Sequence, residues 1–208
     1  MDGFFVCPNV GVEQGARSIM QLWVGLGNPG TQYAMHRHNV GFMVIDALEE
    51  VHGFPAPKQK FKGWTMEARL GGEKLVLLKP GTFMNESGQS VRAALDFYKL
   101  EPEDVTVFYD ELDLEPFRVK VKRGGGAAGH NGIRSMIAHI GPEFRRVRIG
   151  IGHPGTKSRV TGHVLGNYAK SEIDELADML GVVAAEADWL AKGDDARFMS
   201  EVAMRMQE

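Results

Sequence analysis

Short runs of β-forming residues alternate with amphipathic helical patterns along this chain, and this alternation limits the fold more than any other feature. Gln21–Leu26 and Val105–Tyr109 are apolar runs typical of buried strands, and Val147–Ile151 is a third. Asn39–Val51 and Ser87–Leu100 carry apolar residues three to four positions apart, which predicts a helix in each segment. Interleaved strands and helices predict an α/β fold, in a single domain of three layers.

The same signals predict the remaining elements. Gly71-Gly72 separates two β-type segments and indicates a hairpin. Phe117–Lys122 alternates apolar and basic residues, which is typical of a strand with one buried face and one solvent-exposed, basic face. Asn131–Ile140 has helical spacing after a glycine-rich loop. The longest apolar stripe predicts a helix from Ser171 to Ala191, opened by a capping box at its first residue and followed by a short helix after Asp194-Asp195.

The 208 residues suit a single domain with one sizeable core. Residues 1–19 show no period and contain Pro8 and several glycines, so we expect a flexible N-terminal extension before one catalytic domain over residues 20–208. The single cysteine, Cys7, has no partner for an internal disulfide, which fits a reducing, cytoplasmic compartment. No apolar run approaches the roughly 18 residues that a membrane span needs, so we expect no membrane association.

The segment Gly25–Gly30 matches the dinucleotide-binding pattern G-x-G-x-x-G after a predicted strand. That pattern binds a pyrophosphate only where a helix begins inside it. Here Pro29-Gly30 is a turn signal, and helical spacing starts only at Asn39. We therefore interpret the segment as a tight loop at a strand end, which in α/β proteins can also carry an active site.

Polar residues gather after the predicted strands and before the predicted helices. His38 is a natural proton acceptor near neutral pH, and Asp110 could orient its imidazole. No G-x-S-x-G elbow supplies a nucleophile, so an activated water is the expected attacking group. Asn28, Asn85 and Asn131 could position a substrate or donate to an oxyanion. The alternative for an asparagine before a helix, such as Asn85, is an N-cap.

Asn39 also precedes a predicted helix, and there too an N-cap is the ordinary interpretation. A metal site is the rival use of the neighbouring residues. His36 and His38 could lie on one side of an extended segment, while Asp110 and the acidic residues after it offer oxygen ligands. The chain has no HExxH, paired CxxC or EF-hand spacing, and we predict no metal.

Five motifs, taken together, resemble the bacterial-type peptidyl-tRNA hydrolases. They occur in the order GLGNPGTQYAMHRHNVGF, LLKPGTFMNESG, DELDLEP, GGGAAGHNGI, and FRRVRIGIGHPG followed by GHVLGNY. The resemblance runs from about Met20 to the C-terminus. It implies a monomeric enzyme with a mixed, twisted sheet enclosed by helices, and it implies no metal or organic cofactor. The implied reaction is hydrolysis of the ester between a peptide and the 3′-terminal ribose of tRNA, which recycles tRNA from peptidyl-tRNA released by stalled ribosomes.

The resemblance also assigns roles to individual residues. His38 matches the general base and Asp110 the carboxylate that supports it. Asn28, Asn85 and Asn131 match asparagines that bind substrate and position water, and the last two could distinguish a peptide amide from a free amino group. The residues that match the peptide and terminal-adenosine end of the cleft are Tyr33, Met84 and His130. The basic residues that match tRNA-phosphate contacts are Lys120, Lys122 and Arg148.

Two positions depart from the family pattern. His36 stands where the family usually has a small hydroxyl residue, and Ala127-Ala128 replaces a more glycine-rich loop before His130. Alanines there could stiffen a loop that covers part of the cleft.

The distribution of charge is compatible with a nucleic-acid partner, although the net charge is −3. Residues 117–160 hold ten lysines and arginines against one acid, a local charge of +9, whereas residues 171–208 hold ten acids against three bases, a local charge of −7. Phosphate contacts respond to the local field more than to the total. Two other function classes stay open: a nucleotide-dependent oxidoreductase, which would use the glycine loop, and an RNA-binding protein without catalysis, which would use only the basic segment.

Overall fold

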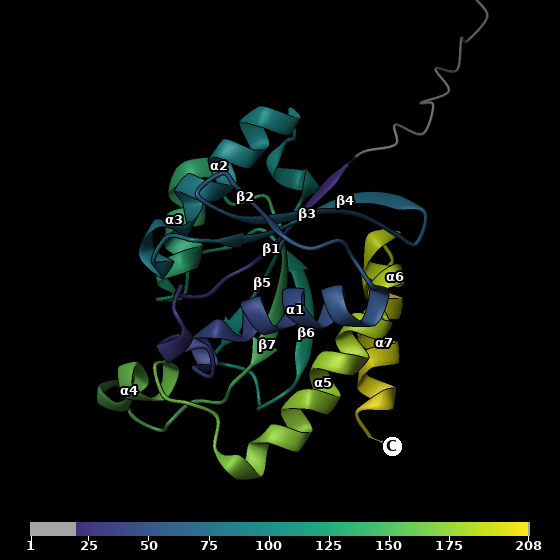
Figure 1. Cartoon of the computed structure of the whole chain (residues 1–208). Helices are drawn as coiled ribbons and strands as arrows, with labels where there is room; N and C mark the ends of the chain where they lie inside the picture. Colours follow the sequence, from purple (N-terminus) through teal and green to yellow (C-terminus); the bar gives the residue numbers. More distant parts are fainter. Residues whose placement is uncertain (1–19, 208) are drawn as a thin grey trace, which may run out of the picture.

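The computed structural model describes residues 20–207, which form a seven-stranded sheet between two layers of helices (Figure 1). The strands are β1 Gln21–Gly25, β2 Lys58–Lys60, β3 Gly63–Leu70, β4 Glu73–Pro80, β5 Val105–Glu111, β6 Val119–Arg123 and β7 Arg145–Gly150. The helices are α1 Val40–His52, α2 Ser87–Tyr98, α3 Asn131–Ile140, α4 Val160–Val164, α5 Ile173–Ala185, α6 Ala187–Ala191 and α7 Asp195–Arg205. The predicted three-layer α/β architecture with a mixed sheet is confirmed. The expected extension over residues 1–19 lies outside the described residues.

The sheet has a parallel centre and antiparallel edges, in the order β2-β3-β4-β1-β5-β7-β6. Strand β1 lies between β4 and β5 and is parallel to both. Gly25 at the end of β1 pairs with Phe108 of β5, so the loops that follow these two strands leave the sheet side by side. Crevices beyond the carboxyl ends of central parallel strands are the usual binding sites of α/β sheets.

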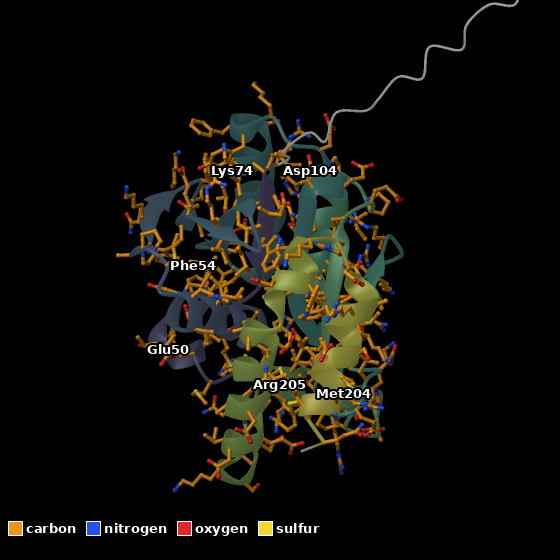
Figure 2. The ribbon with its side chains drawn as sticks, turned by 90° about the vertical axis from the view of Figure 1, so that its right-hand side faces the viewer. Glu50, Phe54, Lys74, Asp104, Met204 and Arg205 are labelled. Carbon is orange, nitrogen blue, oxygen red and sulfur yellow. The ribbon has the colours of Figure 1, made fainter. Side chains whose placement is uncertain are left out.

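The two faces of the sheet carry separate hydrophobic cores because neighbouring strand residues point to opposite sides. Trp23 of β1 belongs to the core under α1, α5, α6 and α7, whereas Val24 belongs to the core under α2 and α3. Both side chains are fully buried. Figure 2 looks onto the C-terminal helices, which lie together over one side of the sheet. Burial of both faces explains why the central strands are continuous apolar runs.

The predicted long helix over Ser171–Ala191 is wrong in two respects. The chain turns at Glu186, where α5 ends and α6 begins, because α6 packs under the β3–β4 hairpin rather than continuing the direction of α5. The capping box predicted at Ser171 is absent from this described segment. Ser171 lies inside a 3₁₀ turn, Lys170–Glu172, and the Glu172 carboxylate instead accepts the backbone N–H of Ala169 at 2.6 Å.

Two elements of the structure are not predicted by the sequence patterns. Strand β2 at the edge of the sheet has the sequence KQK, which contains no apolar residue and therefore has no apolar–polar alternation to detect. Helix α4 has only five residues, too few to show a helical period. Among residues 20–207, no helix combines the length and the apolar character that crossing a bilayer requires.

Two glycines bring α1 onto the sheet at close range. A Cβ atom at Gly41 in the first turn of α1 would lie 2.3 Å from the Phe108 carbonyl oxygen and 2.4 Å from the Leu26 nitrogen. A Cβ atom at Gly25 would lie 2.2 Å from the Gly41 carbonyl oxygen. The start of α1 can therefore touch the ends of β1 and β5 only without side chains at these positions. This contact places the turn before α1, which carries His38, next to the end of β5.

We expect Gly41→Ala to lower the free energy of unfolding by about 2–3 kcal/mol, since backbone atoms must move to admit one methyl group. Gly181→Ala in α5 is the matched control, because a Cβ there meets nothing within 4 Å. The control should be neutral or stabilising by up to about 1 kcal/mol, from improved helix propensity. Urea unfolding measures both, and equal effects of the two substitutions would contradict the close approach.

Candidate active site

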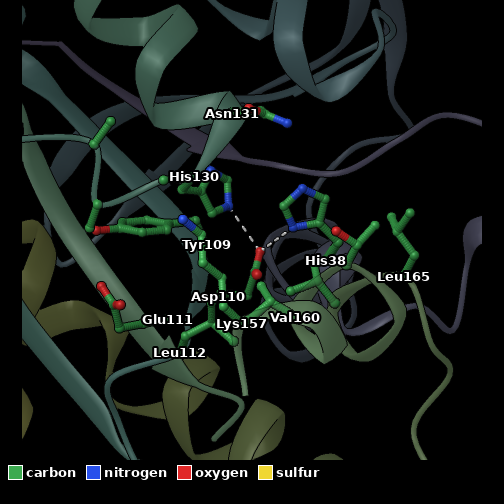
Figure 3. A pocket seen from close by; sticks show the side chains of 15 residues that line it. His38, Tyr109, Asp110, Glu111, Leu112, His130, Asn131, Lys157, Val160 and Leu165 are labelled. Carbon is green, nitrogen blue, oxygen red and sulfur yellow. Dashed lines mark hydrogen bonds and ion pairs between the residues drawn. The ribbon is translucent and has the colours of Figure 1, made fainter. Parts of the chain in front are cut away.

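A buried carboxylate at the end of β5 binds two imidazoles. The Asp110 Oδ1 atom lies 2.8 Å from His38 Nδ1 and 3.0 Å from His130 Nε2 (Figure 3). His38 comes from the 3₁₀ turn Arg37–Asn39 before α1, and His130 precedes α3, so three distant segments meet at one oxygen. His38 and Asp110 are both buried, and the two imidazole ring centroids lie 4.7 Å apart.

The hydrogen bonds assign the tautomers of both histidines. His130 caps α3: its Nδ1 accepts the backbone N–H of Ile133 at 3.2 Å. The proton of a neutral His130 therefore sits on Nε2, which donates to Asp110. His38 likewise donates from Nδ1 to Asp110, which leaves its Nε2 as a free acceptor. A histidine held by a carboxylate with one free nitrogen is suited to general-base catalysis.

The two imidazoles also control the ionisation of Asp110. Burial alone raises the pKa of this carboxyl, but the charges of His130 and His38 and their hydrogen bonds outweigh burial and hold the pKa of Asp110 well below its usual range. Asp110 is therefore a carboxylate near neutral pH. The ionised carboxylate accepts both N–H groups in charge-assisted hydrogen bonds, which are stronger than bonds to a neutral carboxyl.

The donor set of His38, Asp110 and His130 has the composition of a metal site, with ligand atoms within 4.8 Å of one another. The hydrogen bonds argue against that use. Coordination through His130 Nε2 would move the proton to Nδ1, where it would face the Ile133 N–H and break the cap of α3. The residues fit a proton network better than a metal ion.

A second network joins the loop after β1 to the turn that carries His38. The Asn39 side chain bonds Asn28 twice: Asn39 Nδ2 donates to the Asn28 carbonyl oxygen, and the Asn28 N–H donates to Asn39 Oδ1, both at 2.9 Å. Asn28 Oδ1 accepts the Met84 N–H at 2.8 Å. Asn39 holds the N-cap position of α1, as predicted, but its carboxamide is used by Asn28 and makes no cap hydrogen bond to the helix. The N-cap interpretation of Asn85 is wrong, since Glu86 holds that position at α2.

This network also decides between the uses of the glycine loop. Residues 31–33 after the loop form a 3₁₀ turn, and α1 begins only at Val40. The loop therefore lacks the helix N-terminus that a pyrophosphate requires, and the Asn28 N–H is already bonded. The interpretation as a tight loop is confirmed.

A cavity of about 450 Å³ opens beside the two histidines (Figure 3). Asn131 and the loop over residues 127–129 line one part of it, and Tyr109 contacts His130 edge-on at 5.0 Å between ring centroids. The residues on the α4 side are Lys157, Val160, Thr161, Val164 and Leu165. Tyr109 and the α4 side could not be found from the sequence, because nothing in the spacing of these residues distinguishes them from core or surface residues.

The chain matches the family model described as "Peptidyl-tRNA hydrolase" over residues 22–208. A peptidyl-tRNA hydrolase of Sphingopyxis alaskensis is 73% identical over 188 residues, covering 90% of this chain and 100% of the relative. One of Erythrobacter litoralis is 71% identical with the same coverage. A solved peptidyl-tRNA hydrolase from Acinetobacter baumannii superposes with a TM-score of 0.81 at 43% identity, covering 88% of this chain and 94% of that one.

The chain belongs to the peptidyl-tRNA hydrolase family. The resemblance drawn from its motifs is confirmed.

Among the described residues that line this cavity, Asn28, Tyr33, Met84 and Asn85 of the family pattern are not found. Asn85 is exposed in the 3₁₀ turn before α2, and Tyr33 is half-buried with its ring edge-on to His36. Met84 is buried in the core under α2 and α3, and its sulfur would lie 2.5 Å from a Cβ at Gly132. Met84 thus joins the Asn28 side chain, through its backbone N–H, to the start of α3, against which its sulfur packs.

The basic residues of the family pattern lie on the paired strands β6 and β7. Lys120 pairs with Arg148, and both Lys120 and Lys122 are exposed. Arg148 is more constrained than its charge suggests, because its Nε donates to the buried Glu111 carboxylate at 2.9 Å. Partial burial of the Lys122 side chain lowers its pKa, and the nearby charges of Arg148 and Arg146 lower it further.

Arg146 was not singled out by the sequence, yet it anchors the glycine loop. It is fully buried, and its two Nη atoms donate to the carbonyl oxygens of Gly125 at 2.5 Å and Gly126 at 2.6 Å. Its guanidinium also lies 4.5 Å from the centroid of the Phe144 ring. The loop that leads to His130 is therefore fixed at its base by a buried cation.

The low pKa of Asp110 predicts how acid affects stability. A carboxyl whose folded pKa lies below its unfolded value of about 3.9 contributes stability that is present above that value and is lost as the pH falls towards the folded pKa. We expect Asp110→Asn to be destabilising at pH 6 and the difference from wild type to shrink between pH 4 and pH 2. Urea unfolding across this range measures it, and a difference that grows on acidification would contradict the assignment.

Proposed function

We propose that this chain hydrolyses the ester that joins a peptide to the 3′-terminal ribose of tRNA, with His38 as the general base. The observation that carries this proposal is the free Nε2 of His38, fixed beside the cavity by the Asp110 carboxylate. Because an acyl ester is already reactive, a positioned water, a base and an oxyanion donor suffice for its hydrolysis.

In this mechanism His38 Nε2 takes a proton from water, and the resulting hydroxide attacks the ester carbonyl. Asp110 holds the imidazole and stabilises the imidazolium that forms. Asn131 lines the cavity at the N-terminus of α3, where free N–H groups and the helix dipole favour a developing oxyanion. The ribose oxygen then takes the proton from His38 and leaves as an alcohol. His130 Nε2 donates to the same Asp110 oxygen and so helps to hold the carboxylate in place.

The tRNA would bind through the exposed lysines of β6 and the loop that Arg146 anchors. Three observations support this: Lys120 and Lys122 project from one face of β6, Arg148 lies beside Lys120, and segment 117–160 carries a local charge of +9. Arg148 would offer its Nη groups, since its Nε is bound to Glu111. We further propose that the enzyme acts as a monomer in the cytoplasm, where peptidyl-tRNA arises.

An RNA-binding protein without catalysis is the alternative, and the two differ in their dependence on His38. A binding protein would not need a histidine with one nitrogen fixed by a buried carboxylate and the other free. The geometry at Asp110 therefore favours the enzyme.

We expect His38→Ala to reduce turnover of N-acetyl-aminoacyl-tRNA at least about 100-fold, the lower range for loss of a general base. The fold should survive, because His38 is at the cavity edge of the core. His139→Ala is the control, since His139 is an exposed histidine at the far end of α3. Release of N-acetyl-amino acid, measured with and without chelator, tests the proposal. Near-normal turnover by the His38 variant would refute the base assignment, and loss of wild-type activity on chelation would reinstate a metal.

We expect Lys120→Gln to weaken tRNA affinity and to reduce the slope of log affinity against log salt concentration by about one phosphate contact. Lys74→Gln is the control, because Lys74 is exposed at the opposite end of the sheet in the β3–β4 hairpin (Figure 2). Filter binding at several salt concentrations measures both. Equal slopes for the wild type and the Lys120 variant would remove Lys120 from the interface.

A further inference from the structure

Arg37 directly precedes His38, and its guanidinium reaches the segment that follows α4. Arg37 Nη1 donates to the Asn167 carbonyl oxygen at 2.7 Å, and Arg37 Nη2 pairs with Glu172 Oε2 at 2.6 Å. The guanidinium carbon also lies 5.2 Å from the centroid of the Tyr168 ring. One side chain thus joins the His38 turn to a part of the chain about 130 residues further on.

The backbone reinforces this junction. The Arg37 N–H donates to the Gly166 carbonyl oxygen at 3.0 Å, and the Tyr168 N–H donates to the Met35 carbonyl oxygen at 3.1 Å. Residues 36 and 167 form an isolated antiparallel bridge between these two bonds. We refer to residues 35–37, residues 166–168 and Glu172 as the Arg37 clasp.

The clasp is preorganised and tightly packed. Glu172 Oε2 also accepts the Ala169 N–H at 2.6 Å, so a backbone hydrogen bond holds the same carboxylate oxygen that Arg37 binds. A Cβ at Gly166 would lie 2.9 Å from the Gly162 carbonyl oxygen in α4, which shows how closely the clasp abuts that helix. The Arg37 side chain is only 13% exposed and that of Glu172 26%, so solvent screens this pair less than an ordinary surface pair.

The residues adjacent to the two strands of the clasp line the same cavity. His38 lines it on one side, and Val164 and Leu165, immediately before Gly166, line it on another. Asp110 fixes only Nδ1 of His38, and a single hydrogen bond leaves the imidazole free to shift with its backbone. The clasp fixes that backbone. A displacement of about 1 Å in a reacting group can reduce a rate by about 100-fold.

We propose that Arg37 is a positioning residue that holds the His38 turn and the α4 side of the cavity at one fixed separation. This inference rests on the proposed function, because it takes His38 as the base. It adds a dependence on a residue that touches neither Asp110 nor the water, and it makes Glu172, beyond α4, part of the support of His38.

The test uses single-turnover hydrolysis of N-acetyl-aminoacyl-tRNA by the full chain in excess. We expect Arg37→Gln to lower the saturating rate at least about tenfold, with a smaller change in the half-saturating enzyme concentration. Arg37→Lys should recover part of the rate, because an ammonium can still pair with Glu172 but cannot fork to Asn167. Arg37→Gln combined with Glu172→Gln should be no slower than Arg37→Gln alone, since both substitutions remove the same pair.

Arg92→Gln is the matched control. It breaks the Arg92–Asp96 ion pair on α2, whose side chains are 52% and 57% exposed, and it should leave the rate unchanged. If Arg37→Gln does not fold by circular dichroism, the rate of Arg37→Lys decides. Rates within twofold of wild type in the folded Arg37 variants would overturn the clasp while leaving the proposed function intact. An inactive wild-type protein would instead refute the proposed function.

Discussion

The buried charge of Asp110 is the constraint on which the rest of the site depends. A carboxylate withdrawn from water needs strong donors, and here the donors are two imidazoles from segments that the sequence separates widely. His130 can serve because it also caps α3, so the start of that helix is set by the same ring that donates to Asp110. His38 can serve because Gly25 and Gly41 allow α1 to approach the ends of β1 and β5. Fold and chemistry therefore share one set of contacts.

Side chains, rather than regular secondary structure, join the loops around the cavity. Asn39 bonds both backbone groups of Asn28 as a neighbouring strand would, and the Asn28 side chain continues the connection to Met84. Together these bonds tie the loops after β1 and β4 to the turn before α1. In this arrangement the Asn39 carboxamide and Asn28 Oδ1 are already hydrogen-bonded, whereas Nε2 of His38 has no partner among residues 20–207.

The sequence predicted the parts of this protein that depend on local pattern. The buried central strands and helices α1, α2 and α3 are recognisable because burial imposes a period on their residues. His38 and Asp110 could be named from the family motifs, but the second imidazole on Asp110 could not, because the bond between residues 110 and 130 depends on the geometry of two loops. Asn39 was taken for a cap, since its position before α1 is the same whether its side chain turns back to the helix or across to Asn28. The break at Glu186 arises from tertiary packing of α6, which an apolar stripe does not encode.

The buried guanidinium of Arg146 holds the first part of the glycine loop to β7, through its bonds to the carbonyl oxygens of Gly125 and Gly126. The far end of the loop is held as well, because Ala127 packs against the core under α2 and α3 and its carbonyl oxygen accepts the His130 N–H at 2.8 Å. Between these two anchors lie Ala128 and Gly129, both exposed and both with positive φ angles, of 45° and 85°. This wall of the cavity is therefore attached to the same histidine that donates to Asp110, so that a substitution in the wall also acts on the proton network beside it.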